Sequence, residues 1–236
     1  MGLVSKTAQV LFWPLWIAAA FFISQFLIVG LSMSPLIANL LGDGTLSMML
    51  IQALVYAVTL VLAVGVPYLL KDRAKLPKIP KLLSVDRRLK AKDFLAGAKY
   101  LVIYYAFLLA IMIPLTLLLP DIMGQEQDIG FDTATTVPWE LVLVFIALVV
   151  IAPLAEELLM RGLLFGRLRE QLPFWPTALI VSAVFALAHW QFNVSIDTFI
   201  LSMVLCFARE KTGTVYAGVL IHAVKNCVAF GLLFFS

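Results

Sequence analysis

Two adjacent glutamates, Glu156 and Glu157, follow a run of almost purely apolar residues from Leu141 to Leu154. Arg161 comes five residues after Glu156, and hydrophobic sequence then resumes. A carboxylate in the middle of such a sequence costs about 3 kcal/mol to place in a membrane. Groups that are costly to bury in a membrane are usually functional, and a carboxylate can accept or deliver a proton. We therefore take this doublet as the first candidate for chemistry.

Helical geometry gives the two glutamates different roles. Glu157 and Arg161 are four residues apart, so they share one face of a helix and can form an ion pair. Glu156 projects about 100° away from that face and has no such partner. Burial without a counter-charge favours the neutral form of a carboxylic acid, as suits a proton donor or acceptor. Glu156 is thus predicted to be a general base or acid and Glu157 a structural anchor, unless both only brace Arg161 at the membrane rim.

The only two histidines of the chain, His189 and His222, also lie in apolar segments. Phe185 precedes His189 by four residues and Asn226 follows His222 by four, so each pair shares a helix face. Glu156 and His189 could polarise a water molecule and take its proton. His222 and Asn226 could donate hydrogen bonds to the oxyanion that forms during acyl transfer. The chemistry expected from this set is hydrolysis of an amide bond.

Other uses of these residues remain open at the level of sequence. Covalent catalysis is disfavoured, because no serine or cysteine lies beside either histidine in a recognisable nucleophile turn. Two histidines and a glutamate are adequate zinc ligands, but the helical His-Glu-x-x-His signature is absent, so a metal-free site without any cofactor is favoured. A proton-coupled transporter would use Glu156 and His189 as a relay, although no inverted repeat supports one. A non-catalytic immunity or scaffold protein that sequesters a peptide is the remaining alternative.

The elements that must position these groups are transmembrane helices. Hydrophobic residues make up 63% of the chain and charged residues 13%, a composition that a soluble domain of this size cannot cover. The fold class expected is all-α, a polytopic helix bundle in the cell membrane, forming one domain over residues 1–236 with a catalytic core at 138–230. Lys6 precedes an apolar run of full spanning length, so a retained first helix is expected rather than a signal peptide. Apolar stretches of about 20 residues predict seven spans, or eight if the fourth breaks, near 10–32, 47–70, 94–119, 138–158, 174–192, 196–208 and 214–235.

A helical hairpin is predicted to bring two of the candidate residues together. Pro173 and Pro176 indicate a turn between the fourth and fifth segments. Glu156 lies 17 residues before Pro173 and His189 lies 16 residues after it, which places both about 25 Å from the turn along antiparallel helices. They would then face each other, provided that the fourth segment continues as a helix to about residue 170. Pro153 predicts a kink just before the glutamates, where it cannot donate to the carbonyl of Val149.

The distribution of charge predicts the orientation of the chain. The loop at 71–93 carries nine basic residues, which are Lys71, Arg73, Lys75, Lys78, Lys81, Arg87, Arg88, Lys90 and Lys92. The charged residues of the next loop are all acidic, namely Asp121, Glu126, Asp128 and Asp132. The positive-inside bias places the basic loop and the amino terminus in the cytoplasm and the carboxyl terminus outside. We interpret the basic loop as a topology signal in preference to a site for anionic lipid headgroups. Membrane lipids are expected partners, and nucleic acid is not.

Three motifs stand in order on successive predicted helices. They read Glu-Glu-Leu-Leu-Met-Arg at 156–161, Phe-Ala-Leu-Ala-His at 185–189 and His-Ala-Val-Lys-Asn at 222–226. Each is weak alone, but the ordered set resembles the CAAX protease and bacteriocin-processing family, also called the type II CAAX prenyl endopeptidase or Abi family. The resemblance covers roughly residues 138–230, and earlier residues resemble the family only as generic membrane helices.

The resemblance implies a glutamate-dependent intramembrane endopeptidase that needs no catalytic metal and whose site is open to the cytosol. It implies that Glu156 and His189 activate the water and that His222 and Asn226 stabilise the oxyanion. The supporting residues would be Glu157, Arg161 and Phe185. The substrate class implied is a membrane-associated peptide or a lipidated protein, either a prenylated CAAX-like protein or a bacteriocin-type peptide. Lys225 departs from this pattern, as a charge in mid-span to which the sequence assigns no role.

Overall fold

The computed structural model describes residues 3–42, 44–70, 76–125, 129–131, 135 and 137–235, and within these ranges every regular element is a helix. The first half contains α1 (Leu3–Ser32), α2 (Pro35–Leu41), α3 (Thr45–Leu60), the π-helical η1 (Val61–Gly65), α4 (Val66–Leu70), α5 (Ile79–Leu82), α6 (Ala91–Leu118) and α7 (Pro120–Met123). The second half contains α8 (Pro138–Phe145), the π-helical η3 (Ile146–Ile151), α9 (Ala152–Glu157), the π-helical η4 (Leu158–Leu164), α10 (Phe165–Arg169), α11 (Phe174–Leu187), α12 (Phe192–Thr212) and α13 (Tyr216–Phe235).

Within the described residues, six helical stretches are long and apolar enough to cross a membrane, and they confirm an all-α, multi-pass membrane protein. They are Thr7–Ser32, Thr45–Leu69, Ala91–Leu118, Pro138–Arg169, Phe192–Thr212 and Tyr216–Phe235. The fifth predicted segment, 174–192, corresponds to α11, which has 14 residues and is shorter than a full span. The fourth is one continuous helix of 32 residues. The prediction that it extends to about residue 170 is therefore confirmed, and no break produces an eighth span.

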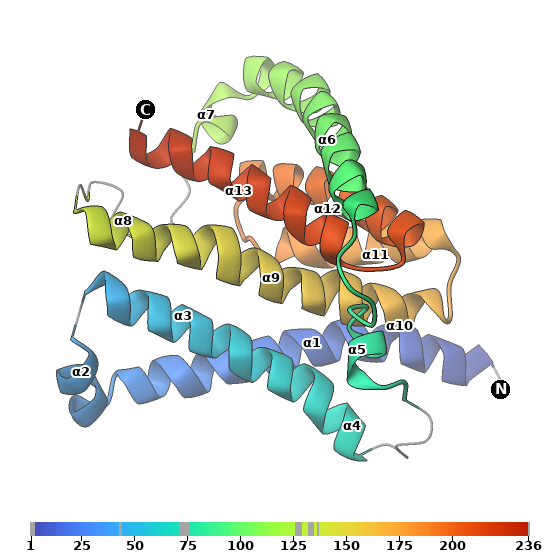
Figure 1. The fold of residues 1–236 in the computed structure, drawn as a ribbon, viewed down its shortest axis with the longest axis horizontal. Helices are drawn as coiled ribbons and strands as arrows, with labels where there is room; N and C mark the ends of the chain where they lie inside the picture. The colour runs from blue at the N-terminus through green and yellow to red at the C-terminus, as the bar shows by residue number, and fades with distance from the viewer. Residues whose placement is uncertain are drawn as a thin grey trace.

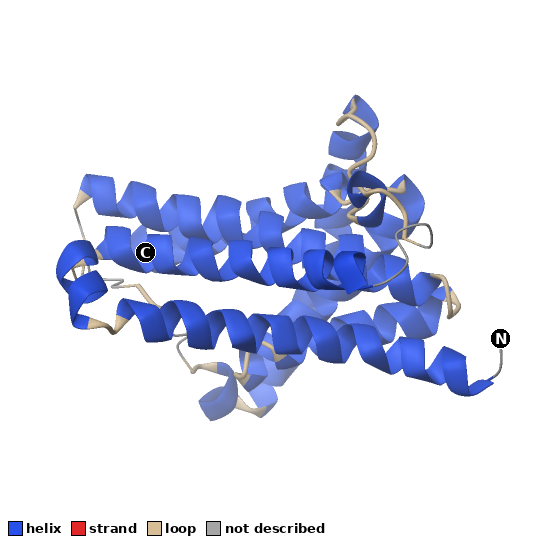
Figure 2. Cartoon of the chain, turned by 90° about the horizontal axis from the view of Figure 1, so that it is seen from below, coloured by secondary structure: helices blue, strands red, loops and turns tan. Residues whose placement is uncertain are grey.

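Most of the long helices run roughly along one axis, so the bundle has two ends, while α6 crosses the others obliquely (Figures 1 and 2). One end holds the start of α1, together with α4, α5 and α10, and we call it the basic end because the basic loop lies there. The other holds α2, α7, the start of α8 and the carboxyl terminus, and we call it the acidic end (Figure 1). Lys71, Asp72, Arg73 and Lys75 of the basic loop and Glu126, Asp128 and Asp132 of the acidic loop lie outside the described residues.

Apolar side chains are distributed as expected for a protein in lipid. Large hydrophobic residues such as Phe26 and Leu117 are about four-fifths exposed, which is favourable only where hydrocarbon replaces water around them. The largest buried cluster among the described residues instead joins α1, η4, α10 and α11, and it includes Trp13, Leu164 and Phe185. This cluster fixes the helix that carries the glutamates against α11, which carries His189.

The helix from α8 to α10 changes register just before the glutamates. In η3 the backbone N–H of Ala152 bonds the carbonyl of Ala147, which is π-helical spacing. The carbonyl one position later belongs to Leu148, and its π-helical partner would be Pro153, which has no N–H. Asn226 of α13 supplies the missing donor, since its Nδ2 lies 2.8 Å from the Leu148 oxygen. The sequence predicted that Pro153 leaves the carbonyl of Val149 without a donor, whereas the affected carbonyl is that of Leu148. The sequence does not reveal the π-helical hydrogen bonding that causes this shift of one residue.

The loop from Leu76 to Lys90 is seated on the basic end of the bundle. Arg87 forms an ion pair with the buried Asp93 and also donates to Thr214. Arg209 of α12 donates to the Ser84 hydroxyl. A Cβ on Gly162 would lie 2.6 Å from the Leu83 carbonyl oxygen, so only glycine permits this approach. At least part of the basic loop therefore closes the end of the bundle in addition to any role in topology.

Candidate active site

One cavity in the bundle contains all four of the predicted catalytic side chains. It has a volume of about 220 Å³ and is lined by Glu156 from α9, His189 from the end of α11, and His222 and Asn226 from α13. These side chains come from three separate stretches of sequence, and the hairpin between α10 and α11 brings the first two together as predicted. The remaining lining residues are Gln52, Tyr56, Ile129, Leu148, Ala152, Val194, Thr198, Lys225, Ala229, Phe230 and Leu233.

Glu156 faces the cavity, but it has partners that helical spacing did not predict. The hydroxyl of Tyr56, on α3, donates to Glu156 Oε1 over 2.5 Å. On the opposite side, His222 Nε2 lies 3.7 Å from Glu156 Oε2, and the Glu156 side chain is 18% exposed. Both carboxylate oxygens are therefore oriented by neighbours, while part of the group is still open to the cavity. Such an arrangement holds a carboxylate in position for proton transfer to a water molecule.

The ring of His189 is fixed by the residue four positions before it. Its Nδ1 lies 2.8 Å from the carbonyl oxygen of Phe185. A carbonyl only accepts hydrogen bonds, so Nδ1 must carry the proton and Nε2 is left as an acceptor in the neutral ring. The Phe185 ring also packs edge-on against the imidazole, with 4.9 Å between the centroids. The predicted contact between these two rings is confirmed.

A network of buried side chains lies behind the cavity wall. Glu157 and Arg161 form the predicted ion pair at 2.8 Å, and both side chains are fully buried. Glu157 Oε1 also lies 3.2 Å from His222 Nδ1. Phe185 covers this layer, with the Arg161 guanidinium 4.7 Å from the centre of its ring. Glu157, Arg161 and Phe185 thus orient the two histidines without lining the cavity.

Asn226 and Lys225 form part of the same wall on α13. One N–H of the Asn226 amide is used by the Leu148 carbonyl, which leaves the second N–H for a ligand in the cavity. Lys225 pairs with Asp197 of α12 at 3.0 Å, and Asp197 also accepts a hydrogen bond from Tyr104. The lysine that the sequence left unexplained is therefore half of an ion pair beside the cavity.

Four polar residues of the site neighbourhood were missed at the level of sequence, namely Gln52, Tyr56, Tyr104 and Asp197. Gln52 and Tyr56 are four residues apart on α3, so both face the cavity. The Gln52 side-chain oxygen is buried and has no hydrogen-bond partner among the residues that the structure describes. The signal in the sequence is a polar pair four residues apart in an otherwise apolar span. An unpartnered buried oxygen at the cavity wall suits a ligand that donates hydrogen bonds.

Gly218 provides a test of how closely this network is packed. A Cβ at this position would lie 2.6 Å from Glu157 Oε2, which is buried and unpaired. We expect Gly218→Ala to push Glu157 away from His222, to destabilise the protein by about 1–3 kcal/mol and to impair any activity of the site. Gly231→Ala on the same helix is the matched control, because no atom of the described residues lies within 4 Å of its added Cβ. Thermal unfolding in detergent compares the two, and equal stability would contradict this packing.

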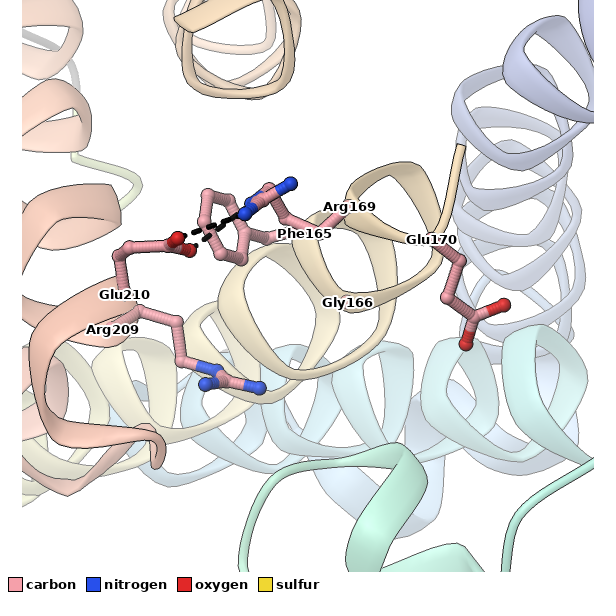
Figure 3. A pocket seen from close by; sticks show the side chains of 6 residues that line it. All are labelled: Phe165, Gly166, Arg169, Glu170, Arg209 and Glu210. Carbon is pink, nitrogen blue, oxygen red and sulfur yellow. Dashed lines mark hydrogen bonds and ion pairs between the residues drawn. The ribbon is translucent and has the colours of Figure 1, made fainter. Parts of the chain in front are cut away.

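A second hollow, of about 290 Å³, lies between α10 and the end of α12 and contains none of the candidate residues. Figure 3 shows the ion pair between Arg169 and Glu210 across it, with Glu170 pointing away. This hollow is at the basic end and is not continuous with the site. Within the described ranges, no three histidine, cysteine, aspartate or glutamate side chains are grouped so as to hold a metal ion.

The fold and the site together define a class of multi-pass membrane protein in which a glutamate and two histidines line one internal cavity. Residues 138–228 match the family model described as type II CAAX prenyl endopeptidase Rce1-like. All four candidate side chains lie inside the matched region. The family resemblance inferred from the motifs is confirmed.

The chain is also similar to an Escherichia coli protein described as an uncharacterized 24.3 kDa protein. The two are 30% identical over 100 residues, which is 40% of this chain and 45% of that protein. The similarity thus spans less than half the length of that relative. No solved structure matches this chain.

Proposed function

We propose that this protein is an intramembrane endopeptidase that hydrolyses a peptide bond of a membrane-associated substrate, with Glu156 as its general base and without a metal ion. The observation that supports this most directly is the shared cavity of Glu156, His189, His222 and Asn226. The Rce1-like match over residues 138–228 supports the same reaction class.

The proposed reaction begins with a water molecule held between Glu156 and His189. Nε2 of His189 accepts one hydrogen bond from this water, and Glu156 takes the other proton as the oxygen attacks the scissile carbonyl. The carbonyl oxygen becomes an oxyanion, which accepts hydrogen bonds from the free N–H of Asn226 and from protonated His222. The proton held by Glu156 then passes to the leaving amine, and the C–N bond breaks.

The positions of the supporting residues fit these roles. Glu157 lies 3.2 Å from His222 Nδ1 and so fixes the ring with Nε2 towards the cavity. Tyr56 holds Glu156 from the side of α3. Donors fixed before the reaction need no reorganisation as charge develops, and this preorganisation is usually the largest contribution to catalysis.

Cleavage by the purified protein tests the proposal. A farnesylated CAAX-type peptide and a non-lipidated hydrophobic peptide are each incubated with the protein in nanodiscs, and the products are identified by mass spectrometry. We expect cleavage of at least one peptide, with one oxygen of bulk water incorporated at the new carboxyl terminus. Binding of both peptides without any cleavage would favour the scaffold alternative.

Metal removal separates the metal-free mechanism from a zinc-dependent one. We expect full activity after exhaustive dialysis against EDTA and 1,10-phenanthroline, because the proposed nucleophile is activated by Glu156 and His189 alone. The measurement is the initial rate of peptide cleavage, compared with a sample to which zinc is restored. Activity that disappears on chelation and returns with zinc would establish the zinc-dependent version instead.

A further inference from the structure

Two polar side chains of the cavity wall, Gln52 and Lys225, take no part in the proposed reaction, although both line the cavity. Gln52 precedes the region 138–228 that matches the family model, and Lys225 is the residue of the third motif to which the sequence assigned no role. Polar and charged groups are costly to place within a membrane span and are usually functional there. These two residues therefore need an explanation of their own.

Gln52 and Lys225 lie at the same depth in the bundle, on opposite sides of the helix that carries Glu156. Both α3 and α13 pack against α9, and α9 lies between them in Figure 1. Tyr56 and His222 each contact Glu156, so these three side chains define one level. Gln52 is four residues before Tyr56, and Lys225 is three residues after His222. The two helices run in opposite directions, so at about 1.5 Å per residue both positions are displaced by about 5 Å in the same direction from that level.

The two side chains offer complementary hydrogen-bonding groups. Gln52 presents a buried amide oxygen that has no partner among the described residues. The Lys225 ammonium has three N–H donors. Its ion pair with Asp197 Oδ2 uses one of them at 3.0 Å, the Lys225 side chain is 17% exposed, and Asp197 Oδ1 accepts from Tyr104. Since Asp197 already supplies the counter-charge and would repel a second carboxylate, a neutral carbonyl oxygen is the more suitable further acceptor for Lys225.

We propose that Gln52 and Lys225, which we call the polar pair, bind the backbone of a substrate segment that lies extended between α3 and α13. The proposal rests on the proposed protease function. A segment that is to be cleaved must be unwound, and within a membrane its freed N–H and C=O groups need new partners. In an extended chain these groups point to opposite edges at successive residues. Gln52 accepts from an N–H on one edge, and Lys225 donates to the carbonyl of a neighbouring residue on the other.

The distance of the polar pair from Glu156 indicates which substrate residues it holds. An extended chain advances by about 3.3 Å per residue, so a displacement of about 5 Å corresponds to one or two residues from the scissile bond. Both contacts are with the backbone and therefore do not depend on the side chains of the substrate. The substrate class is thus an extended peptide segment that is recognised beside the scissile bond with little dependence on its sequence.

Equilibrium binding tests the polar pair without requiring catalysis. The parent protein carries Glu156→Gln, and the probe is the non-lipidated hydrophobic peptide, fluorescently labelled and titrated with the protein in nanodiscs. We expect Gln52→Met to raise Kd by about three- to tenfold, the contribution of one neutral hydrogen bond. Lys225→Met combined with Asp197→Asn leaves no unpaired charge and should raise Kd by about 10- to 100-fold. Lys225→Arg keeps the donors and should bind like the parent, as should Gln171→Met, whose position is not among the described lining residues.

Replacing single amides of the peptide with esters shows whether the contact is with the backbone. Each ester removes one N–H and changes the shape of the peptide little. We expect one position at which the ester weakens binding to the parent by about three- to tenfold but has no effect on binding to Gln52→Met. A purely structural role of Gln52 would not remove the effect of an ester at one position.

The outcomes separate this proposal from the protease proposal. Unchanged Kd in the Gln52 and Lys225 variants, or equal effects of every ester on the parent and on Gln52→Met, would overturn the role of the polar pair. Binding that depends on the polar pair, together with no cleavage by the wild-type protein, would instead remove the protease and leave this role intact. A parent protein that binds neither this peptide nor the farnesylated one would also overturn the role of the polar pair.

Discussion

Replacing Glu156 with glutamine is expected to lower kcat/KM for peptide cleavage by about 10²–10⁴, the usual contribution of a positioned general base. Glutamine keeps the size of the side chain, and its amide oxygen can still accept the hydrogen bond from Tyr56. What it loses is the ability to take a proton from water. Initial rates at several peptide concentrations measure kcat and KM separately, and we expect the loss in kcat with little change in KM.

The matched control for this variant is Glu170→Gln. Glu170 is half-exposed and pairs with Arg167, and it is not among the described residues that line the cavity. The Glu170→Gln variant should therefore cleave the peptide at the wild-type rate. A Glu156→Gln protein that unfolds at the wild-type temperature yet cleaves as fast as the wild type would remove Glu156 from the mechanism.

Replacing Arg161 with methionine is expected to destabilise the protein by about 3–5 kcal/mol, because it leaves Glu157 as a buried carboxylate without its counter-charge. Both members of the pair are fully buried and are 2.8 Å apart. The loss should also disturb His222, since Glu157 contacts its Nδ1. Denaturation in detergent gives the stability, and peptide cleavage gives the effect on the site.

Two comparisons show whether the buried charge is the cause. In the double variant Glu157→Gln with Arg161→Met, no charge is left unpaired, so we expect much of the lost stability to return while activity stays low. Arg169→Met breaks a pair that is about one-third exposed on both sides, and its cost should be about 0–1 kcal/mol. Equal losses for Arg161→Met and Arg169→Met would contradict the role assigned to the buried pair.

Local periodicity made much of the site predictable. The contact of Phe185 with His189 and the pair of Glu157 with Arg161 follow from four-residue spacing on one helix, and both are present. The meeting of Glu156 and His189 at one cavity follows from equal distances to a turn at Pro173. Each of these inferences needs only the helical repeat and the position of one break.

Contacts between distant helices were not predictable in the same way. Tyr56 and Glu156 are 100 residues apart, and their hydrogen bond depends on the angle at which α3 packs against α9. The bond from Asn226 to Leu148 depends on a π-helical register that propensity does not encode. Gly218 is required only because Glu157 lies against it.

The sequence by itself determined that this protein is a bundle of membrane helices, and it predicted two glutamates, two histidines and an asparagine as the candidate reactive groups. Hydropathy and charge are properties of each segment, so they can be read from the sequence without any knowledge of packing. Only the tertiary structure decided that the loop at 76–90 packs over Arg161 and Gly162, because this contact joins segments that are far apart in the sequence. The physical reason is that a wall is made by several segments at once, whereas a sequence pattern describes one segment at a time.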